Sequence, residues 1–322
     1  MSPDSHPVNR RPAPGGCFGR MFAALLAVTL AGALGGCPLQ QPQRGESEPQ
    51  SIVLTFDDGP LPADVADPAA LNSEELLAPL HAILAVLERR GLRAVFYVKG
   101  PGTDAAAAAL SDVYAQALAT LHGAGHVLGY HAFDHDPRIW IDPCNPPWRA
   151  LTLMDRDLDR LTAFLDGVLP RAGLSRATTF TPLFRQPYGG AGLFEPEGEA
   201  VAAARGWVYH GFRLDSFDWI VNADADPRVV ARLPVETEEQ RVALVLRQLR
   251  AGVARTAREQ FVDVLFHVNG LTARHLDEWI DALSEASARD PRGPARIEVP
   301  DRYLTDSDPI VDLSLIADLL SA

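Results

Sequence analysis

The sequence predicts an α/β fold with a mainly parallel sheet, either open or closed into a barrel. Short apolar runs typical of buried strands alternate with longer segments of helical periodicity, and polar residues follow the strand ends. Strands that alternate with helices predict crossover connections and therefore parallel pairing. The chain has 322 residues, 47% hydrophobic and 22% charged. This composition is typical of a folded protein with a substantial core.

The elements follow one another without an interruption that would mark a domain boundary. Strands are expected at residues 52–56, 94–98, 126–130, 179–185, 207–212 and 262–267. Between them, apolar residues recur at helical spacing in 76–87, 151–165, 242–249 and 276–283. From Ser51 onward there is no linker, repeat or low-complexity segment, so residues 51–322 are predicted to form one domain.

The N-terminal segment predicts export. Residues 21–34 form an uncharged apolar run after three arginines, too short to span a bilayer but suited to the core of a secretory signal. The sequence Leu34-Gly35-Gly36-Cys37 that follows resembles the lipobox of bacterial lipoprotein precursors. The resemblance implies a signal peptide over 1–36, an acylated Cys37 and a polar tether over 37–50, with ordinary secretion or an uncleaved anchor as alternatives. We therefore expect an extracytoplasmic, membrane-anchored protein in which Cys144 is a lone thiol.

Charge excludes one class of partner. The formal net charge is −13 at pH 7, whereas a nucleic-acid binder needs a basic surface. Lys99 is the only lysine beside 28 arginines, and we interpret this as codon bias in a GC-rich genome. Nothing in the sequence indicates a protein partner.

Candidate functional residues lie at the predicted strand ends, where chemistry collects in parallel α/β folds. His131 and His135 are four residues apart, so on a helix both imidazoles would project from one face and could chelate one ion. Residue 132 is alanine, which excludes the HExxH metalloprotease motif.

Asp57 and Asp58 end the first predicted strand, and Gly59-Pro60 turns the chain directly after them. One aspartate could then bind the ion while the other faces the attacking water. Adjacent carboxylates are poorly suited to the competing use, a glycosidase pair about 5–9 Å apart.

Five segments in order resemble the motifs of the polysaccharide deacetylase family, carbohydrate esterase family four. They are Thr55-Phe56-Asp57-Asp58-Gly59-Pro60, Gly129-Tyr130-His131-Ala132-Phe133-Asp134-His135, Arg185-Gln186-Pro187-Tyr188-Gly189, Asp215-Ser216-Phe217-Asp218-Trp219 and Val264-Leu265-Phe266-His267. The resemblance implies a distorted (β/α) barrel and metal-dependent removal of acetyl groups from a glycan. Ala132 departs from the usual Ser or Thr, which puts one hydrogen bond near the metal in doubt.

The resemblance also implies a role for each matching residue. The metal ligands would be Asp58, His131 and His135. Asp57 would be the general base, oriented by Arg185, and His267 the general acid, held in its charged state by Asp218. The backbone N–H of Tyr188 would stabilise the oxyanion, and the walls of the acetyl pocket would be Pro187, Trp219 and Leu265.

The expected cofactor is a divalent metal, zinc first, with cobalt or another divalent ion as alternatives. The expected partners are an acetylated glycan, N- or O-linked, and the membrane through the lipid anchor. A non-catalytic glycan-binding protein on the same fold and a small-molecule amidase are the alternative functions. The segment 136–148 carries Trp140 and Trp148, which either stack on sugar rings or cover the rim of the barrel.

Overall fold

The computed structural model describes residues 49–305, except 143, 193–194, 224, 226–229, 232, 234, 257–258, 260 and 291. Its strands form one sheet with the order β5-β4-β3-β2-β1-β7-β6, and β8 pairs with β1. Every pairing is parallel, as predicted. The strands are β1 (Ser51–Gly59), β2 (Val95–Lys99), β3 (Val127–Ala132), β4 (Phe180–Phe184), β5 (Val208–Tyr209), β6 (Leu214–Asp215), β7 (Phe261–His267) and β8 (Arg296–Ile297).

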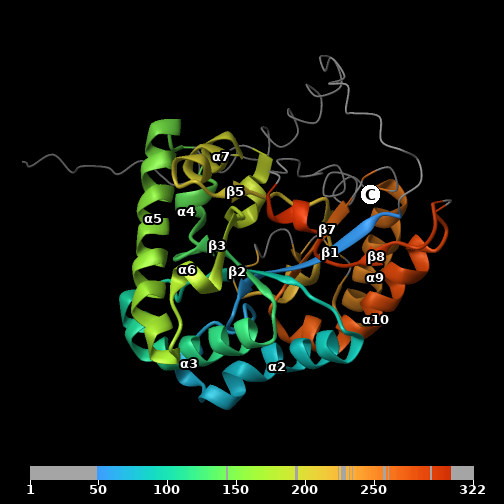
Figure 1. The fold of residues 1–322 in the computed structure, drawn as a ribbon, viewed down its shortest axis with the longest axis horizontal. Helices are drawn as coiled ribbons and strands as arrows, with labels where there is room; N and C mark the ends of the chain where they lie inside the picture. Colours follow the sequence, from blue (N-terminus) through green and yellow to red (C-terminus); the bar gives the residue numbers. More distant parts are fainter. Residues whose placement is uncertain are drawn as a thin grey trace, which may run out of the picture.

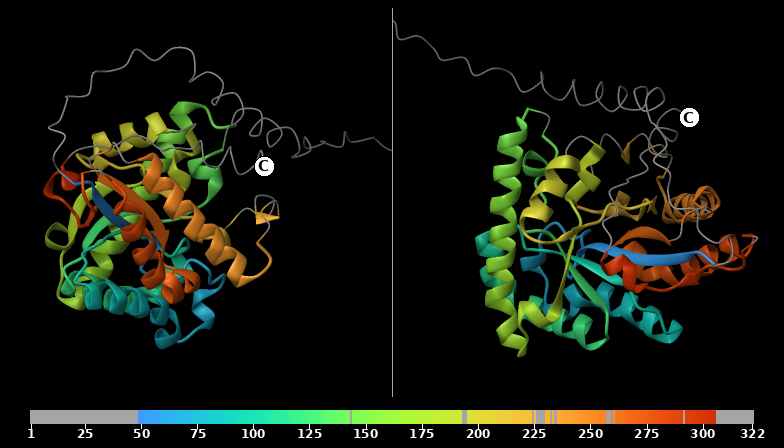
Figure 2. Two further views of the ribbon diagram at one scale, coloured as in Figure 1. Left: turned by 90° about the vertical axis from the view of Figure 1, so that its right-hand side faces the viewer. Right: turned by 45° about the horizontal axis from the view of Figure 1, so that its top comes forward.

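Helices cover the outer face of the sheet, and Figure 1 shows α5, α3, α2, α10 and α9 as an arc around it. The long α5 stands at one side of the molecule, with α9 and α10 at the other (Figure 2). The helices are α2 (Ser73–Arg90), α3 (Asp104–Gly123), α4 (Pro137–Trp140), α5 (Pro147–Val168), α6 (Arg176–Thr179), α7 (Glu195–Ala204), α9 (Glu238–Arg255) and α10 (Gly270–Ser287).

Local sequence signals set the starts of the long helices. Asn72 and Thr237 each form a capping box, at α2 and α9. Asn269 caps α10 through its side chain, which accepts from the backbone N–H of Thr272. These caps satisfy backbone donors that have no partner within the helix.

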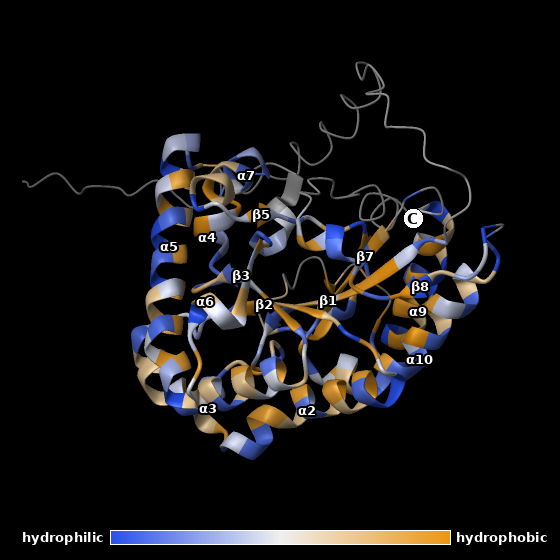
Figure 3. Ribbon diagram, in the orientation of Figure 1, coloured by the Kyte–Doolittle hydropathy of each residue, from blue (hydrophilic) through white to orange (hydrophobic). Residues whose placement is uncertain are grey.

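Successive side chains of a strand pack into two different cores, one on each face of the sheet. On β1, the side chains that face the helices belong to the main core, and they are Ile52, Leu54 and Phe56. Figure 3 shows this strand as hydrophobic. Val53 instead packs in a smaller cluster within the curl of the sheet, with Tyr97 and Tyr303. Because side chains alternate along a strand, Thr55 and Asp57 follow Val53 on this inner face.

The sheet is curled, and one segment of chain that the sequence did not predict passes between its two edges. The expected strand 207–212 is paired only at Val208–Tyr209, beside β4. The N–H of His210 still donates to Phe184 of β4, whereas the N–H of Arg213 donates to Asp263 of β7. Residues 210–213 therefore pass from one edge of the sheet to the other, and the sheet has the form of a distorted, incompletely paired (β/α) barrel.

The predicted signal peptide, Cys37 and all but the last two residues of the tether lie outside the described residues. Gln50 belongs to the fold, since its side chain is buried and its carbonyl accepts from the N–H of Arg296 at 2.8 Å. Cys144 is disulfide-bonded, which corrects the prediction of a lone thiol. The other two cysteines of the chain, Cys17 and Cys37, lie outside the described residues. In the part of the chain that is described, no helix has the length and apolar character needed to cross a membrane.

Candidate active site

The end of β1 brings two adjacent carboxylates to the same side of the sheet. Asp57 is on the inner face of the strand and pairs in register with His267 of β7. Asp58 has a φ of 62°, in the left-handed region, and the pairing of β1 with β2 shifts register between Phe56 and Gly59. The turn therefore begins at Asp58 itself, one residue before the predicted Gly59-Pro60, and breaks the alternation that would have turned this carboxylate away.

Asp58, His131 and His135 form the cluster that was predicted to bind a metal. Their ligand atoms lie within 4.8 Å of one another. Asp58 Oδ1 is 3.5 Å from Nε2 of each histidine. The two histidines do not share a helix: His131 belongs to β3, and His135 lies in the loop that follows. The loop folds back toward the strand end, which brings the two rings to 5.3 Å.

The chemistry of these donors fits a divalent cation. Asp58 Oδ1 is buried and accepts no hydrogen bond within the described residues, a costly arrangement unless a cation completes it. His131 Nδ1 lies 2.7 Å from the backbone carbonyl of Arg185, so Nδ1 carries the proton and Nε2 offers its lone pair to the cluster. Burial opposes charge on Asp58, but the two histidines and Lys99 hold its pKa well below the usual value. Asp58 is thus ionised, as a ligand of a divalent cation would be.

Asp57 is held by a fully buried arginine. Arg185 Nη1 donates to Asp57 Oδ1 at 3.1 Å and to Thr55 Oγ1 at 2.6 Å. The other arm, Nη2, donates to Asp263 Oδ2 at 2.7 Å. The guanidinium therefore joins β1 to β7 through the interior of the curled sheet and contacts the carboxylate that it was expected to orient.

His267 is held by Asp218 through two bonds. Its Nδ1 lies 2.8 Å from Asp218 Oδ1, and its backbone N–H donates to Oδ2 at 2.7 Å. Burial opposes charge on the imidazole, but the Asp218 carboxylate outweighs this and raises the pKa of His267 to about 10. Asp218 itself is fully buried. The structure thus brings together a carboxylate suited to act as a base and an imidazolium suited to act as an acid.

The remaining predicted residues lie around this pair. Tyr188 has a φ of 58°, and its hydroxyl donates to the carbonyl of His135 at 2.7 Å. Trp219 is half-buried, and its Nε1–H donates to Asp215, which pairs in register with Leu265. Pro187 is buried. In segment 136–148, Trp140 is fully buried, whereas Trp148 is 69% exposed, so only Trp148 is accessible to a glycan.

Sequence reasoning missed several partners of these residues. Asn222 Nδ2 donates to Asp58 Oδ2 at 3.4 Å, and the hydroxyl of Thr272 donates to Asp218. Asp263 in the middle of β7 is the second carboxylate of Arg185. Lys99, assigned to codon bias, has its Nζ 3.6 Å from Asp58 Oδ1. A charged residue at an inward position of an apolar strand was the available signal for Asp263.

Part of the chain is similar to a known protein family. Residues 44–192 match the polysaccharide deacetylase family model. That stretch holds the three predicted metal ligands and Arg185, whereas Asp218 and His267 lie beyond it. A search of curated proteins found no match.

Similar solved structures include the catalytic domain of peptidoglycan N-acetylglucosamine deacetylase from Eubacterium rectale, at 17% identity, 84% coverage of this chain, 98% of that chain and a TM-score of 0.49. A CE4 esterase from Streptococcus mutans has 22% identity, 78% and 86% coverage and a TM-score of 0.48. A CE4 family pseudoenzyme from Bacillus anthracis has 15% identity, 82% and 68% coverage and a TM-score of 0.49. Residues 44–192, which hold the three predicted metal ligands, are thus similar to the polysaccharide deacetylase family.

Proposed function

We propose that the protein is a metal-dependent hydrolase that removes N- or O-linked acetyl groups from an extracytoplasmic polysaccharide. The observation that carries the proposal is that a carboxylate and an imidazole, each held by a partner, lie beside the cluster of three predicted metal ligands. Asp57 is held by Arg185, and His267 is held by Asp218. A glycan-binding protein has no need of a separate base and acid, so this arrangement favours an enzyme.

In the proposed reaction, water adds to the acetyl carbonyl carbon, and acetate leaves after the bond to the glycan nitrogen or oxygen breaks. A bound divalent ion, zinc first among the candidates, would supply Lewis acidity and lower the pKa of water. Asp57 accepts the proton of the attacking water. His267 donates a proton to the leaving amine or alkoxide, and Arg185 and Asp218 are positioning residues for this pair.

Acetate release from a panel of acetylated glycans tests the proposal. EDTA should abolish release, and added Zn²⁺ or Co²⁺ should restore it. Asp57→Asn is the matched control, since it keeps the side-chain shape and the three predicted ligands. Full turnover by Asp57→Asn, or release that persists in EDTA, would overturn the mechanism.

We also propose that the protein is a lipoprotein anchored through Cys37, which the lipobox-like sequence supports. The Cys144 disulfide needs Cys17 or Cys37, the other two cysteines of the chain. Cleavage before Cys37 would remove Cys17, and acylation would use the Cys37 sulfur, so the anchored form and this disulfide exclude each other. Intact mass of the membrane fraction should show a diacylglycerol on Cys37 and its loss in Cys37→Ala. A mature chain with an unmodified Cys37, or with Cys37 in a disulfide, would refute the anchor.

A further inference from the structure

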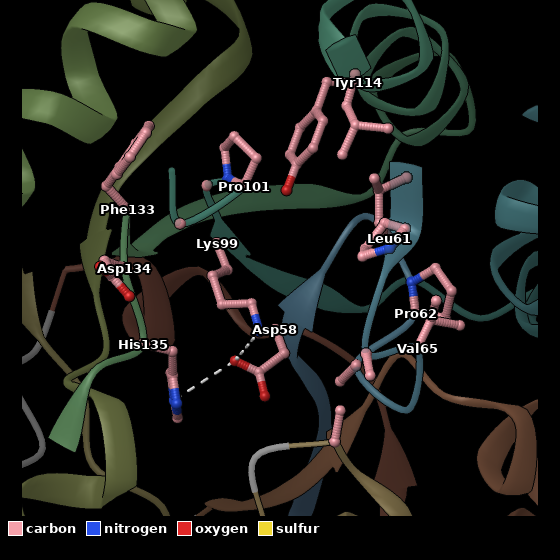
Figure 4. A pocket seen from close by; sticks show the side chains of 17 residues that line it. Asp58, Leu61, Pro62, Val65, Lys99, Pro101, Tyr114, Phe133, Asp134 and His135 are labelled. Carbon is pink, nitrogen blue, oxygen red and sulfur yellow. Dashed lines mark ion pairs between the residues drawn. The ribbon is translucent and has the colours of Figure 1, made fainter. Parts of the chain in front are cut away.

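The loop that carries the predicted ligand His135 is held by one face of α5. This loop lies between β3 and α4 and belongs to no helix or strand. Figure 4 shows Phe133, Asp134 and His135 in succession, with the His135 ring directed toward Asp58 and the Phe133 ring away from it. Three side chains of α5 contact the first two residues of the loop, and they are Asp157, Arg160 and Phe164. Residues at this spacing share one face of a helix.

His135 depends on the loop in a way that His131 does not. His131 belongs to β3, and its Nδ1 lies 2.7 Å from the backbone carbonyl of Arg185. His135 lies beyond the end of the strand, so contacts other than sheet pairing must set the path of its backbone. The position of its ring is therefore only as well defined as the backbone of the loop.

Asp157 supplies the polar contacts of this face of α5. Its Oδ2 accepts from the backbone N–H of Phe133 at 2.7 Å, and its Oδ1 accepts from the backbone N–H of Asp134 at 3.0 Å. Asp157 is only 2% exposed, so water competes little for these bonds. One carboxylate thus holds the two residues that directly precede His135.

Contacts with the side chain of Phe133 fix the same part of the loop. Phe133 is buried, and its ring meets the ring of Phe164 edge-on with 6.0 Å between the centroids. The Arg160 guanidinium lies 4.1 Å from the Phe133 ring centroid. At the other end of the loop, the Tyr188 hydroxyl donates to the carbonyl of His135 at 2.7 Å. The backbone of the loop is therefore held both before and at His135.

The hydrogen bonds of the loop specify a carboxylate at position 157. Burial raises the pKa of Asp157 to about 7; the two loop N–H groups and Arg160 oppose this effect, and the Asp134 carboxylate adds to it. Above this pH the side chain is ionised and only accepts hydrogen bonds, which matches its two N–H donors. Asparagine in its place would turn its amide NH₂ toward one of these donors and leave that N–H unsatisfied.

We propose that Asp157 is a positioning residue of the metal site, whose carboxylate fixes the loop so that the His135 imidazole faces Asp58 and His131. The inference rests on the proposed metal-dependent function. It assigns a role to a residue outside the five segments that resemble family motifs. Residues that orient a metal ligand without touching the ion contribute about 10–100-fold to metal affinity. Asp157 acts in this way through the backbone that precedes its ligand.

Titration with Co²⁺ at pH 8 tests this role without turnover. Asp157 is ionised at this pH, and the visible absorption of bound Co²⁺ reports the number and geometry of its ligands. Asp157→Asn should weaken Co²⁺ binding by about 10–100-fold and change the absorption per bound ion. The same substitution in His135→Ala should cause no further loss of affinity, because the ligand that Asp157 positions is already absent.

Asp159→Asn is the matched control for the loss of a carboxylate from α5. Asp159 lies two residues along the same helix, its side chain is 67% exposed, and it pairs with Arg205. This variant should keep the Co²⁺ affinity and absorption of the parent. A loss as large as that in Asp157→Asn would show a general effect of charge on the helix and refute the role of Asp157.

The remaining outcomes separate this inference from the proposed function. Unchanged Co²⁺ affinity in Asp157→Asn would overturn the inference and leave the proposed function standing. An equal loss of affinity in the His135→Ala background, or an unchanged absorption per bound ion, would assign the effect to the overall fold and reject the positioning role. Because the absorption is taken per bound ion, unfolded chains do not affect this readout. A parent that binds no Co²⁺ would overturn the proposed function and this inference together.

Discussion

Replacement of Asp218 by Asn isolates the effect of one buried carboxylate on the proposed general acid. The oxygens of Asp218 accept from His267 Nδ1–H, His267 N–H, the Ser216 hydroxyl and the Thr272 hydroxyl. All four partners donate to the carboxylate, so an amide nitrogen at either position faces one of the two His267 N–H groups and can keep a hydrogen bond only to a hydroxyl that turns to accept. The side chain keeps its shape, but its charge and two of its bonds are lost.

The size of the effect follows from the pKa of His267. The structure raises this pKa to about 10 from an ordinary value of 6.5, a difference worth about 5 kcal/mol. The folded state therefore binds the proton more tightly than the unfolded state. The resulting stability is fully present below pH 6.5, declines above it, and is lost as the pH rises through about 10. Without the Asp218 charge, only Asp57 and Asp58 still offset the effect of burial, so the pKa of His267 falls.

Two assays measure this change. In EDTA, the free energy of unfolding in urea should decline between pH 7 and pH 10 in the parent, and this decline should be smaller in Asp218→Asn. In the metal-loaded enzyme, the basic limb of the kcat profile should move to lower pH, with kcat near neutrality reduced about 10²–10⁴-fold. Ser216→Ala removes one hydrogen bond to Asp218 without removing charge, and it should leave the basic limb in place. A basic limb shared by the parent and Asp218→Asn would refute the assignment of His267 as the acid.

Four further substitutions test the rest of the site. Asp57→Asn should bind Zn²⁺ with unchanged affinity and lose about 10²–10⁴ in kcat, measured by metal titration and acetate release; weakened metal binding would contradict its role as base. His135→Ala should weaken Zn²⁺ binding by more than about a hundredfold, since loss of a residue that only hydrogen-bonds a metal ligand already costs about 10–100-fold. An unchanged Zn²⁺ affinity would show that His135 is not a ligand. Asp263→Asn should lower the free energy of unfolding by about 1.5–3 kcal/mol in urea, because a charge-assisted bond to Arg185 is lost; no change would contradict the buried bridge. Arg185→Lys should lower kcat while Zn²⁺ affinity persists, and loss of both together would show that the site had collapsed.

The positions of the main catalytic candidates were predictable from the sequence. The carboxyl ends of parallel strands meet at one edge, so polar residues directly after apolar runs converge there. This reasoning brought together residues distant in the chain, such as Asp57 and Arg185, which the structure places at hydrogen-bond distance. It required only the strand assignments, and the boundaries of β1 and β7 were correct to within three residues.

Features that depend on local backbone geometry were not predictable. The spacing of His131 and His135 was consistent with a helix, yet a strand end and a folded loop give the same proximity. The left-handed conformation of Asp58 has no signal of its own, since aspartate adopts it only occasionally. Lys99 illustrates a different failure. The scarcity of lysine in the chain says nothing of where this one lysine lies, and β2 places it beside Asp58.

Arg185 explains why the predicted metal ligands and the base form one unit. Its backbone carbonyl accepts from His131 Nδ1 and sets the orientation of a ligand, while its guanidinium binds Asp57 and sets the orientation of the base. Asp263 on β7 fixes the other arm of the same guanidinium. Strands β1, β3 and β7 therefore cannot shift relative to one another without disturbing this residue, which follows β4. A hydrolytic site needs the water, the base and the ion to stay within a fraction of an ångström of their productive arrangement, and a buried arginine that joins these strands at the closing point of the curl meets that need.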